Sequence, residues 1–374
     1  MKKDFNSLGL MSGTSGDGVD ASIIQSDGES KYKEIYNNYF KYDQKLYEKI
    51  HRIKDEINKF SDLKAQSKKI EILEREITIF HANVAQEIIY KNKQPIDLIG
   101  FHGQTIYHNP KEKISKQLGD AKLLNELIKK TVIYNFREND LKNGGQGAPL
   151  VPIFHKLIAE NKKITLPLCF LNIGGISNIT ILKSYDVKDL MSRDIGPGNC
   201  LIDEWIRKNS KKRYDKDGVL ALAGERNEII FEQALELFST FKNEKLTSLD
   251  TKNFDVSFAR GLSLEDGATT LTDLTSKIIS SSLLSELKEK KNLDCVILLC
   301  GGGRKNKTLI EKIKKNINNK FVIKFIDEYE IDGDYVESQA FAYLAIRSYL
   351  GLSNSFPGTT GCIKACTGGS IIKI

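Results

Sequence analysis

The sequence predicts an α/β protein of two domains, and three observations support this. The chain has 374 residues, which is long for a single core. Its composition, 40% hydrophobic and 28% charged, is typical of a soluble globular protein. Short apolar runs that end in Gly-rich turns alternate with segments of helical periodicity. We expect a first domain of residues 1–130 plus 351–374 and a second of residues 131–350, with the boundary near the Gly-rich loop 144–149.

The first half begins with a predicted β-hairpin, in which strands 5–11 and 18–25 flank a turn of small residues. Two helices should follow, because apolar residues recur there at spacings of three and four. Further short strands end the half. The predicted elements are helices 42–60 and 68–90 and strands 96–101 and 131–135.

The second half repeats this beginning, since strands 168–173 and 178–182 flank another Gly-containing turn. We interpret this as a repeat of architecture rather than of sequence. The later elements are a helix from Leu201, a strand at 296–299, a helix at 307–317 and an amphipathic helix at 337–350.

Composition argues against several classes of protein. The net charge of +7 is modest and the lysines are scattered, which disfavours nucleic-acid binding. No apolar run reaches the roughly 18 residues of a membrane helix, and the N-terminus does not resemble a signal peptide. The six cysteines form no CxxC pair, and no histidine stands at zinc-site spacing, so buried thiols in a cytoplasmic protein are expected.

The turn after the first strand has the composition of an anion-binding loop. Glycines let backbone amides converge on a phosphate, hydroxyls add donors, and carboxylates bind Mg²⁺ or its waters. A P-loop is disfavoured because its Lys is missing, whereas a plain tight hairpin stays open as an alternative. The candidate ATP-binding residues are Ser12, Gly13, Thr14, Ser15, Gly16, Asp17, Gly18, Val19 and Asp20.

Three more Gly turns favour the binding interpretation, because several strand-end glycines in one chain indicate close approach to a ligand. They are Gly174-Gly175, the turn 196–199 and Gly301-Gly302-Gly303. Two strand–Gly–strand hairpins with a late strand–GGG–helix form the layout of the actin-like ATPase and sugar-kinase superfamily. We therefore add Gly174, Gly175, Gly301 and Gly302 to the ATP-binding candidates.

An ordered set of motifs makes the resemblance specific. The set spans nearly the whole chain: GLMSGTSGDGVD (9–20), FHGQTIYHNP (101–110), QLGD (117–120), GGQGAPLVP (144–152), LNIGGISNIT (171–180), DIGPGN (194–199), YDKDG (214–218), CGGG (300–303) and VESQAFAYLA (336–345). In these segments the chain resembles the anhydro-N-acetylmuramic acid kinase family.

The resemblance implies a fold and a reaction. The fold would be two actin-like, ribonuclease H-like α/β domains flanking an ATP cleft, in a homodimer. The enzyme would add water across the 1,6-anhydro bond of anhydro-N-acetylmuramic acid and transfer the γ-phosphate of ATP to O6. The products would be N-acetylmuramic acid 6-phosphate and ADP, in peptidoglycan recycling, with Mg²⁺ as the metal.

Two carboxylates match the family's catalytic positions. Opening the anhydro ring needs a base for the attacking water, and Asp194 matches it; the alternative is an Asp that caps the turn or the following helix. Glu337 matches a glutamate near substrate and metal, with a helix N-terminal acid as its alternative. Asp17 and Glu337 are the expected metal ligands.

Polar residues near strand ends are the expected sugar ligands. His102, Gln104 and Thr105 leave a predicted strand end, where α/β folds bind ligands. Arg137 suits the lactyl carboxylate through a bidentate pair, unless it forms an exposed salt bridge. Asn199 is a further substrate candidate, and Gln146 is a weaker one of the same kind.

The chain departs from the family pattern at Gly16, where Leu is usual, at Asn135, where Asp is usual, and at Ala121, where Gly is usual. A flexible Gly16 would raise the cost of ordering the loop, and Asn135 removes an acidic partner for Arg137. Two rival hypotheses therefore stay open. One is a kinase of the same fold for acetate or a hexose, and the other is a sensor that binds nucleotide or muropeptide without turnover.

Overall fold

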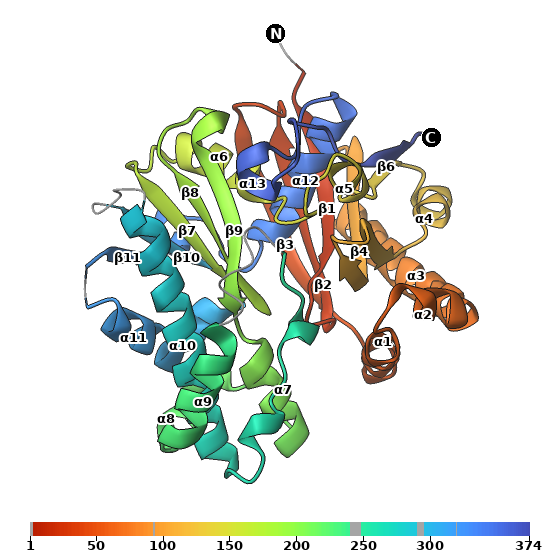
Figure 1. Ribbon diagram of the computed structural model, residues 1–374. Coiled ribbons are helices and arrows are strands. Elements are labelled where there is room, and N and C mark those ends of the chain that lie inside the picture. The colour runs from red at the N-terminus through yellow and green to blue at the C-terminus, as the bar shows by residue number, and fades with distance from the viewer. Residues whose placement is uncertain (1–2, 93, 240–247, 290–294, 319) are drawn as a thin grey trace. The chain divides into compact units, whose positions relative to one another are not determined.

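The structure is a computed structural model that describes residues 3–92, 94–239, 248–289, 295–318 and 320–374. The chain forms two compact units. Unit 1 is Met1–Ile164 with Tyr335–Ile374, and unit 2 is Thr165–Asp334. Each unit has its own β-sheet with helices packed against it (Figure 1).

The sheet of unit 1 has seven strands, in the order β12-β6-β4-β1-β2-β3, with β5 paired to β4. Strands β1, β2 and β3 are antiparallel neighbours, whereas β4 runs parallel to β1 and β6 parallel to β4. The strands are β1 (Phe5–Ser12), β2 (Gly18–Ser26), β3 (Tyr32–Lys41), β4 (Leu98–Asn109), β5 (Ile114–Leu118), β6 (Thr131–Tyr134) and β12 (Ser370–Ile372).

The helices of unit 1 follow the predicted periodicity. In α3, Ile70, Leu73, Ile77, Val84 and Ile88 are buried on one face, as spacings of three and four require. The helices are α1 (Gln44–Glu56), α2 (Phe60–Ala65), α3 (Ser67–Lys91), α4 (Ala121–Ile128), α5 (Glu138–Lys142), α6 (Pro152–Asn161), α12 (Val336–Tyr349) and α13 (Pro357–Thr360).

Helix α12 packs closely against strands β1, β2 and β4 of unit 1. Two glycines make this approach possible. A Cβ on Gly9 would lie 1.9 Å from the Ser338 carbonyl oxygen, and a Cβ on Gly100 would lie 2.2 Å from that of Phe341. The helix is buried on nearly every side, from Ser338 to Ser348, so the prediction of an amphipathic helix was wrong. It is a core helix of unit 1.

The sheet of unit 2 has five strands in the order β11-β10-β7-β8-β9. Strands β7, β8 and β9 are antiparallel, and β7, β10 and β11 are parallel. The strands are β7 (Leu168–Ile173), β8 (Ile176–Leu182), β9 (Leu190–Pro197), β10 (Val296–Cys300) and β11 (Val322–Phe325).

The longest helix of unit 2, α10, contacts β9 and the helices α7, α8, α9 and α11. The helices are α7 (Cys200–Asn209), α8 (Val219–Ala223), α9 (Glu228–Ser239), α10 (Leu264–Glu289) and α11 (Lys307–Asn316). Short 3-10 helices are η1 (Val187–Asp189), η2 (Lys216–Gly218), η4 (Thr251–Asn253), η5 (Ser257–Ala259), η6 (Gly302–Lys305) and η7 (Ile326–Tyr329).

The two sheets share one topology. In each, the first three strands along the chain are antiparallel neighbours. The fourth strand along the chain, β4 in unit 1 and β10 in unit 2, pairs in parallel with the first, β1 or β7. This is the strand order of the ribonuclease H-like fold of actin-like proteins. The predicted α/β class and the architectural repeat are therefore confirmed.

The unit boundaries differ from the predicted domain boundaries. Residues 131–164 and 335–350 were assigned to the second domain, yet both segments belong to unit 1. The reason is pairing and packing, because β6 pairs with β4 and α12 packs on β1. The Gly-rich loop 144–149 is not a linker but a part of unit 1.

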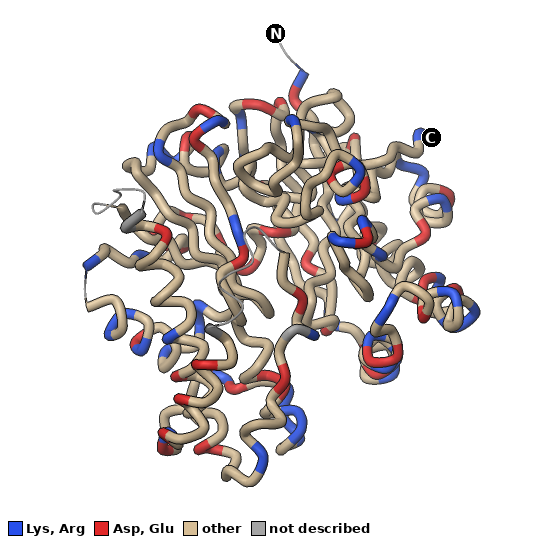
Figure 2. Tube along the Cα trace, viewed as in Figure 1, with Lys and Arg blue, Asp and Glu red and all other residues tan. Residues whose placement is uncertain are grey.

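Charge and hydropathy agree with the sequence. Figure 2 shows Lys and Arg interspersed with Asp and Glu along the helices of both units, as in α1 and α3. Among the helices that the structure describes, each is too short or too polar to cross a membrane.

Candidate active site

In unit 1, the loop between β1 and β2 is clamped by side chains from other elements. The Ser12 hydroxyl lies 2.9 Å from the Gly18 carbonyl oxygen and 2.7 Å from Gln104 Oε1, and accepts from the Tyr42 hydroxyl at 3.0 Å. Gln104 Nε2 donates to the Gly13 carbonyl oxygen at 3.0 Å. Ser12 and Gln104 are buried. The predicted loop and Gln104 are thus brought together.

Helix α1 contributes two contacts that sequence reasoning missed. His51 Nε2 lies 3.0 Å from the Ser15 carbonyl oxygen, and Lys54 Nζ donates to the Thr14 carbonyl oxygen at 2.6 Å. The only signal in the sequence was that both residues stand on one predicted helix next to the hairpin. Both contacts fix the loop backbone from outside.

The structure explains why two positions of the loop are glycine. Gly16 has a φ of +62° and donates its amide to the Gly13 carbonyl oxygen, which closes the turn. A Cβ on Gly18 would lie 2.5 Å from the Phe40 carbonyl oxygen. Val19 is fully buried in the core, so neither its side chain nor its backbone is exposed to a ligand in this structure.

The candidate metal ligands of unit 1 are half-buried carboxylates. Asp17 accepts from the Ser15 hydroxyl at 2.5 Å, and Glu337 stands in the first turn of α12. Neither belongs to a group of three close metal-ligating side chains among the described residues. Mg²⁺ keeps several waters and binds through one or two carboxylates plus phosphates, so a magnesium site does not require such a group.

The motif 102–105 lies inside β4 rather than beyond its end, because β4 continues to Asn109. The register with β1 shifts at this point: Leu10 pairs with Phe101 and Met11 with Gly103, which makes His102 an extra residue. Such a bulge redirects a side chain. Thr105 accepts from Gln117 Nε2 at 3.2 Å on the neighbouring β5.

His102 and Arg137 contact each other directly. Arg137 Nη2 lies 2.9 Å from His102 Nε2, and Arg137 Nη1 donates to the Gly147 carbonyl oxygen at 2.7 Å. Because a guanidinium only donates, Nε2 accepts, and Nδ1 carries the proton that is donated to the Gly103 carbonyl oxygen at 2.7 Å. Burial, with the charge of Arg137, holds the pKa of His102 well below its usual range, so the ring is neutral.

Asn135, where the family resemblance leads us to expect an acid, is exposed and has a φ of +55°. Its side chain donates to Glu138 at 3.3 Å. Asn tolerates this left-handed backbone better than most residues, which gives a local reason for its presence.

In unit 2, two Gly turns are joined by backbone hydrogen bonds. Gly198 donates to Gly175 at 2.9 Å and Asn199 to Gly174 at 2.7 Å. A Cβ on Gly198 would lie 2.2 Å from the Gly174 carbonyl oxygen, so this approach requires glycine. The structure therefore brings the predicted turns 174–175 and 196–199 together.

The third turn of unit 2 follows β10, which runs parallel to β7. Gly301 has a φ of +77°, and a Cβ there would lie 2.3 Å from Asn172 Oδ1 near the end of β7. The three turns are thus at one edge of the sheet. This is the edge at the carboxyl ends of the parallel strands, where α/β folds bind ligands.

A buried arginine that sequence reasoning missed supports this third turn. Arg304 donates to both oxygens of Asp327 at 2.8 Å, to Asp334 at 2.5 Å and to the Gly301 carbonyl oxygen at 3.2 Å. The ion pair with Arg304 lowers the pKa of Asp327, and the ion pairs with Lys305 and Arg304 lower that of Asp334, although burial opposes the effect at both. The partners are separated along the chain, so no sequence pattern linked them.

Asp194, the candidate base, lies in β9 two residues before Gly196. Its Oδ2 accepts from the Leu249 amide at 2.8 Å and from the Ser248 hydroxyl at 3.3 Å. The N-cap of α7 is Asn199 rather than Asp194. The carboxylate is half-buried and oriented by the segment 248–249.

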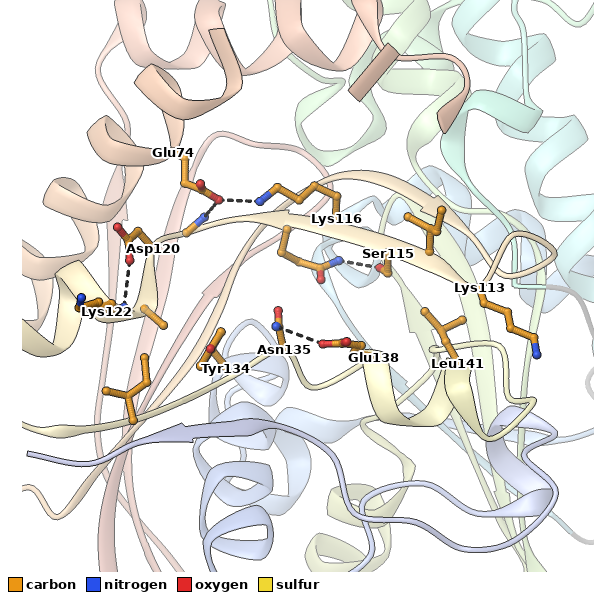
Figure 3. A pocket seen from close by; sticks show the side chains of 15 residues that line it. Glu74, Lys113, Ser115, Lys116, Asp120, Lys122, Tyr134, Asn135, Glu138 and Leu141 are labelled. Atoms are coloured by element: carbon orange, nitrogen blue, oxygen red, sulfur yellow. Dashed lines mark hydrogen bonds and ion pairs between the residues drawn. The ribbon is translucent and has the colours of Figure 1, made fainter. Parts of the chain in front are cut away.

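A separate hollow of about 510 Å³ in unit 1 is lined by polar side chains that pair with each other (Figure 3). Glu74 pairs with Lys116 at 2.7 Å, and Asp120 caps α4 by accepting from the Lys122 amide at 2.9 Å. Two of the departures from the family pattern, Ala121 and Asn135, line it, and none of the candidate site residues does. Its lining groups already serve as partners for one another, so we assign no ligand to it.

Comparison with known proteins matches this arrangement to one family. The family model described as anhydro-N-acetylmuramic acid kinase matches residues 6–373. The chain is 52% identical to the "Anhydro-N-acetylmuramic acid kinase" of Pelagibacter ubique (strain HTCC1062), over 100% of both chains, and 36% identical to that of Agrobacterium fabrum, over 98% of both. A solved structure of the Acidaminococcus fermentans (R)-2-hydroxyglutaryl-CoA dehydratase component A is 11% identical, with a TM-score of 0.45, and the match covers 92% of this chain and 99% of that one. The chain belongs to the anhydro-N-acetylmuramic acid kinase family.

Proposed function

We propose that this protein opens 1,6-anhydro-N-acetylmuramic acid with water and phosphorylates O6 with ATP. Water adds to the anomeric carbon, the bond from that carbon to O6 breaks, and O6 takes the γ-phosphoryl group as ADP leaves. The observation that carries the proposal is Asp194, an oriented carboxylate that directly precedes the joined Gly turns of unit 2.

The Gly turns are proposed to bind the phosphates of ATP. In unit 1 the candidates are the amides and hydroxyls of residues 12–20, whose loop is clamped by Gln104. In unit 2 they are the turns that contain Gly174, Gly175, Gly301 and Gly302. Phosphoryl transfer depends mainly on positioning and charge neutralisation, which preformed backbone donors supply. Mg²⁺, bound through Asp17 and Glu337, would neutralise phosphate charge.

Asp194 is proposed as the general base that takes the proton of the attacking water. Its hydrogen bonds from Leu249 and Ser248 fix the direction of the carboxylate, which a base needs because proton transfer depends on geometry before pKa.

The sugar is proposed to contact His102, Gln104, Thr105, Arg137 and Asn199. Arg137 already donates to His102 and Gly147, which sets the plane of its guanidinium. A guanidinium fixed in this way suits a carboxylate such as the lactyl group, because less side-chain entropy is lost on binding.

A coupled ADP-release assay tests the proposed reaction. We expect ADP release that depends on the anhydro-sugar and yields a 6-phosphorylated product. Release with acetate or glucose alone would favour a different kinase of this fold. Nucleotide binding without any sugar-dependent release would indicate a sensor and would refute the proposal.

Asp194→Asn tests the base. The amide keeps an acceptor for the Leu249 amide but lacks basicity, so turnover should fall by about 10²-fold or more while ATP still binds. Ser248→Ala is the comparison variant, because it removes only the longer hydrogen bond and keeps the basic carboxylate, so its turnover should fall much less than that of Asp194→Asn. Turnover near that of the unmodified enzyme in Asp194→Asn would refute the assignment.

A cytoplasmic location and a homodimer complete the proposal. The reaction consumes ATP, which cells supply in the cytoplasm. Sedimentation of the purified chain at several concentrations checks the dimer, which a constant monomer mass would exclude.

A further inference from the structure

Two cysteines and one aspartate come together in unit 1, outside the candidate active site. Asp140 is in α5, and Cys362 and Cys366 lie in the segment between α13 and β12. One carboxylate oxygen and the two Sγ atoms all lie within 4.8 Å of one another, and all three side chains are buried. It is the one such group among the residues that the structure describes.

We propose that Asp140, Cys362 and Cys366 bind a zinc ion. Thiolates and a carboxylate are ligands of Zn²⁺, and the spacing C-x3-C falls within the range of known zinc sites. Tetrahedral Zn²⁺ with thiolate ligands places its donor atoms about 3.7 Å apart, so the three atoms need to close by only about 1 Å. Water takes the fourth position.

The carboxylate of Asp140 is already oriented for such a role. Oδ1 accepts from the Thr360 hydroxyl at 2.6 Å and Oδ2 from the Gly147 amide at 2.6 Å. Each oxygen keeps a second lone pair for a metal. Hydrogen bonds to a ligating carboxylate are the usual surroundings of metal sites, where they fix the direction of the ligand.

The backbone around the three residues is tied together independently of any metal. Gln146 donates to the Thr360 carbonyl oxygen at 2.9 Å, and Ile363 donates to that of Asn143 at 3.0 Å. A Cβ on Gly145 would lie 2.2 Å from Asp140 Oδ2, so the loop is built around this carboxylate. The ligands are therefore largely preorganised.

The ion would join the segment 357–369 to the loop 144–147, whose Gly147 contacts Arg137. The ion would tie these two segments together outside the candidate active site, and the sequence did not reveal it. The search for CxxC pairs and histidines overlooked C-x3-C, and the third ligand, Asp140, is far away in the chain.

Metal content and a cobalt probe test the proposal on the reduced, full-length protein. After dialysis we expect about one zinc per chain. Co²⁺ added to the metal-free protein should give thiolate charge-transfer bands and the visible bands of tetrahedral cobalt. Cys362→Ser and Cys366→Ser should each weaken metal binding by about 10-fold or more, as should Asp140→Asn.

Cys200→Ser is the matched control, because Cys200 is a free thiol in unit 2 and should not affect binding. Circular dichroism checks that each variant is folded. If Asp140→Asn does not fold, the two cysteine variants alone test whether these residues bind the metal. Absence of zinc and of cobalt bands in the reduced protein would overturn the proposal. An equal loss of metal binding in Cys200→Ser would also overturn it. So would a protein that binds no metal when reduced and forms a Cys362–Cys366 disulfide with peroxide.

Discussion

The two units build their Gly turns in different ways. In unit 1, the loop 12–18 is contacted by the side chains of Tyr42, His51, Lys54 and Gln104. In unit 2, the turns 174–175 and 198–199 are joined by backbone hydrogen bonds and by contacts that only glycine allows. The loop 12–18 is therefore supported mainly by side chains, whereas the turns 174–175 and 198–199 are joined to each other directly through their backbones.

A second contrast concerns histidine. All five histidines of the chain lie in unit 1, and three of them, His81, His102 and His155, are buried. Burial lowers the pKa of His81 to about 4 and that of His155 to about 3, and it lowers that of His102 as well. Acid should therefore act on unit 1 before unit 2.

The largest expected effect is the loss of unit 1 stability in mild acid. Below the unfolded pKa of about 6.5, unfolded histidines bind protons that the folded ones do not, so the free energy of unfolding falls as pH falls. Each buried histidine contributes about 1.4 kcal/mol per pH unit until its folded pKa is reached. Hydrogen exchange between pH 7 and about 5, corrected for intrinsic rates, should show amides of unit 1 losing protection first.

The amides of unit 2 are the internal control. Asp327 and Asp334 of unit 2 have lowered pKa values, so their stabilisation is lost only as pH falls below about 4. In the same experiment, His155→Leu should reduce the pH dependence of unit 1. Equal loss of protection in both units would contradict the contrast.

The next effect concerns the backbone turns of unit 2. Gly301→Ala should lower the free energy of unfolding by about 3 kcal/mol, because its φ of +77° and the 2.3 Å approach to Asn172 both oppose a Cβ. Gly302→Ala is the matched control, since nothing lies within 4 Å of its Cβ. Urea unfolding measures both, and equal stabilities would show that the turn adapts.

A smaller effect is expected from the side-chain clamp of unit 1. Gln104→Leu leaves the buried Ser12 hydroxyl and the Gly13 carbonyl without this partner, which should cost about 2 kcal/mol. The Michaelis constant for ATP should rise by about 10-fold. Gln86→Leu, on the exposed face of α3, is the control and should change neither quantity. An unchanged Michaelis constant for ATP would show that the contacts of Gln104 with the loop do not affect nucleotide binding.

Local sequence patterns predicted most helices and strands. Where the structure differs from the prediction, contacts between residues distant in the chain explain the difference. Periodicity placed α3, and small residues placed the β1–β2 turn, because both depend on neighbouring residues. The extension of β4 through His102 depends on pairing with β1 and β5, which no local pattern contains.

The residues of the candidate site show the same contrast between local patterns and contacts distant in the chain. Motif glycines were recognised in the sequence, whereas Arg304 was not, since its partners Asp327 and Asp334 follow many residues later. Helix α12 was misjudged because its surroundings, not its own periodicity, make it a core helix. The unit boundary was misplaced for the same reason.

The smallest effect concerns Gly16, whose presence the sequence alone suggested would loosen the loop. With a φ of +62° and a Cβ position 3.0 Å from Ile50 Cγ2, Gly16→Leu should destabilise the protein by about 1 kcal/mol. Gly13→Leu is the control, because its Cβ would meet only Ser15 Oγ at 3.8 Å. If Gly16→Leu instead keeps its stability and lowers the Michaelis constant for ATP, the loop can adopt a second conformation. The proposed phosphate contacts of unit 1 would then come from a loop that rearranges, in contrast to the fixed turns of unit 2.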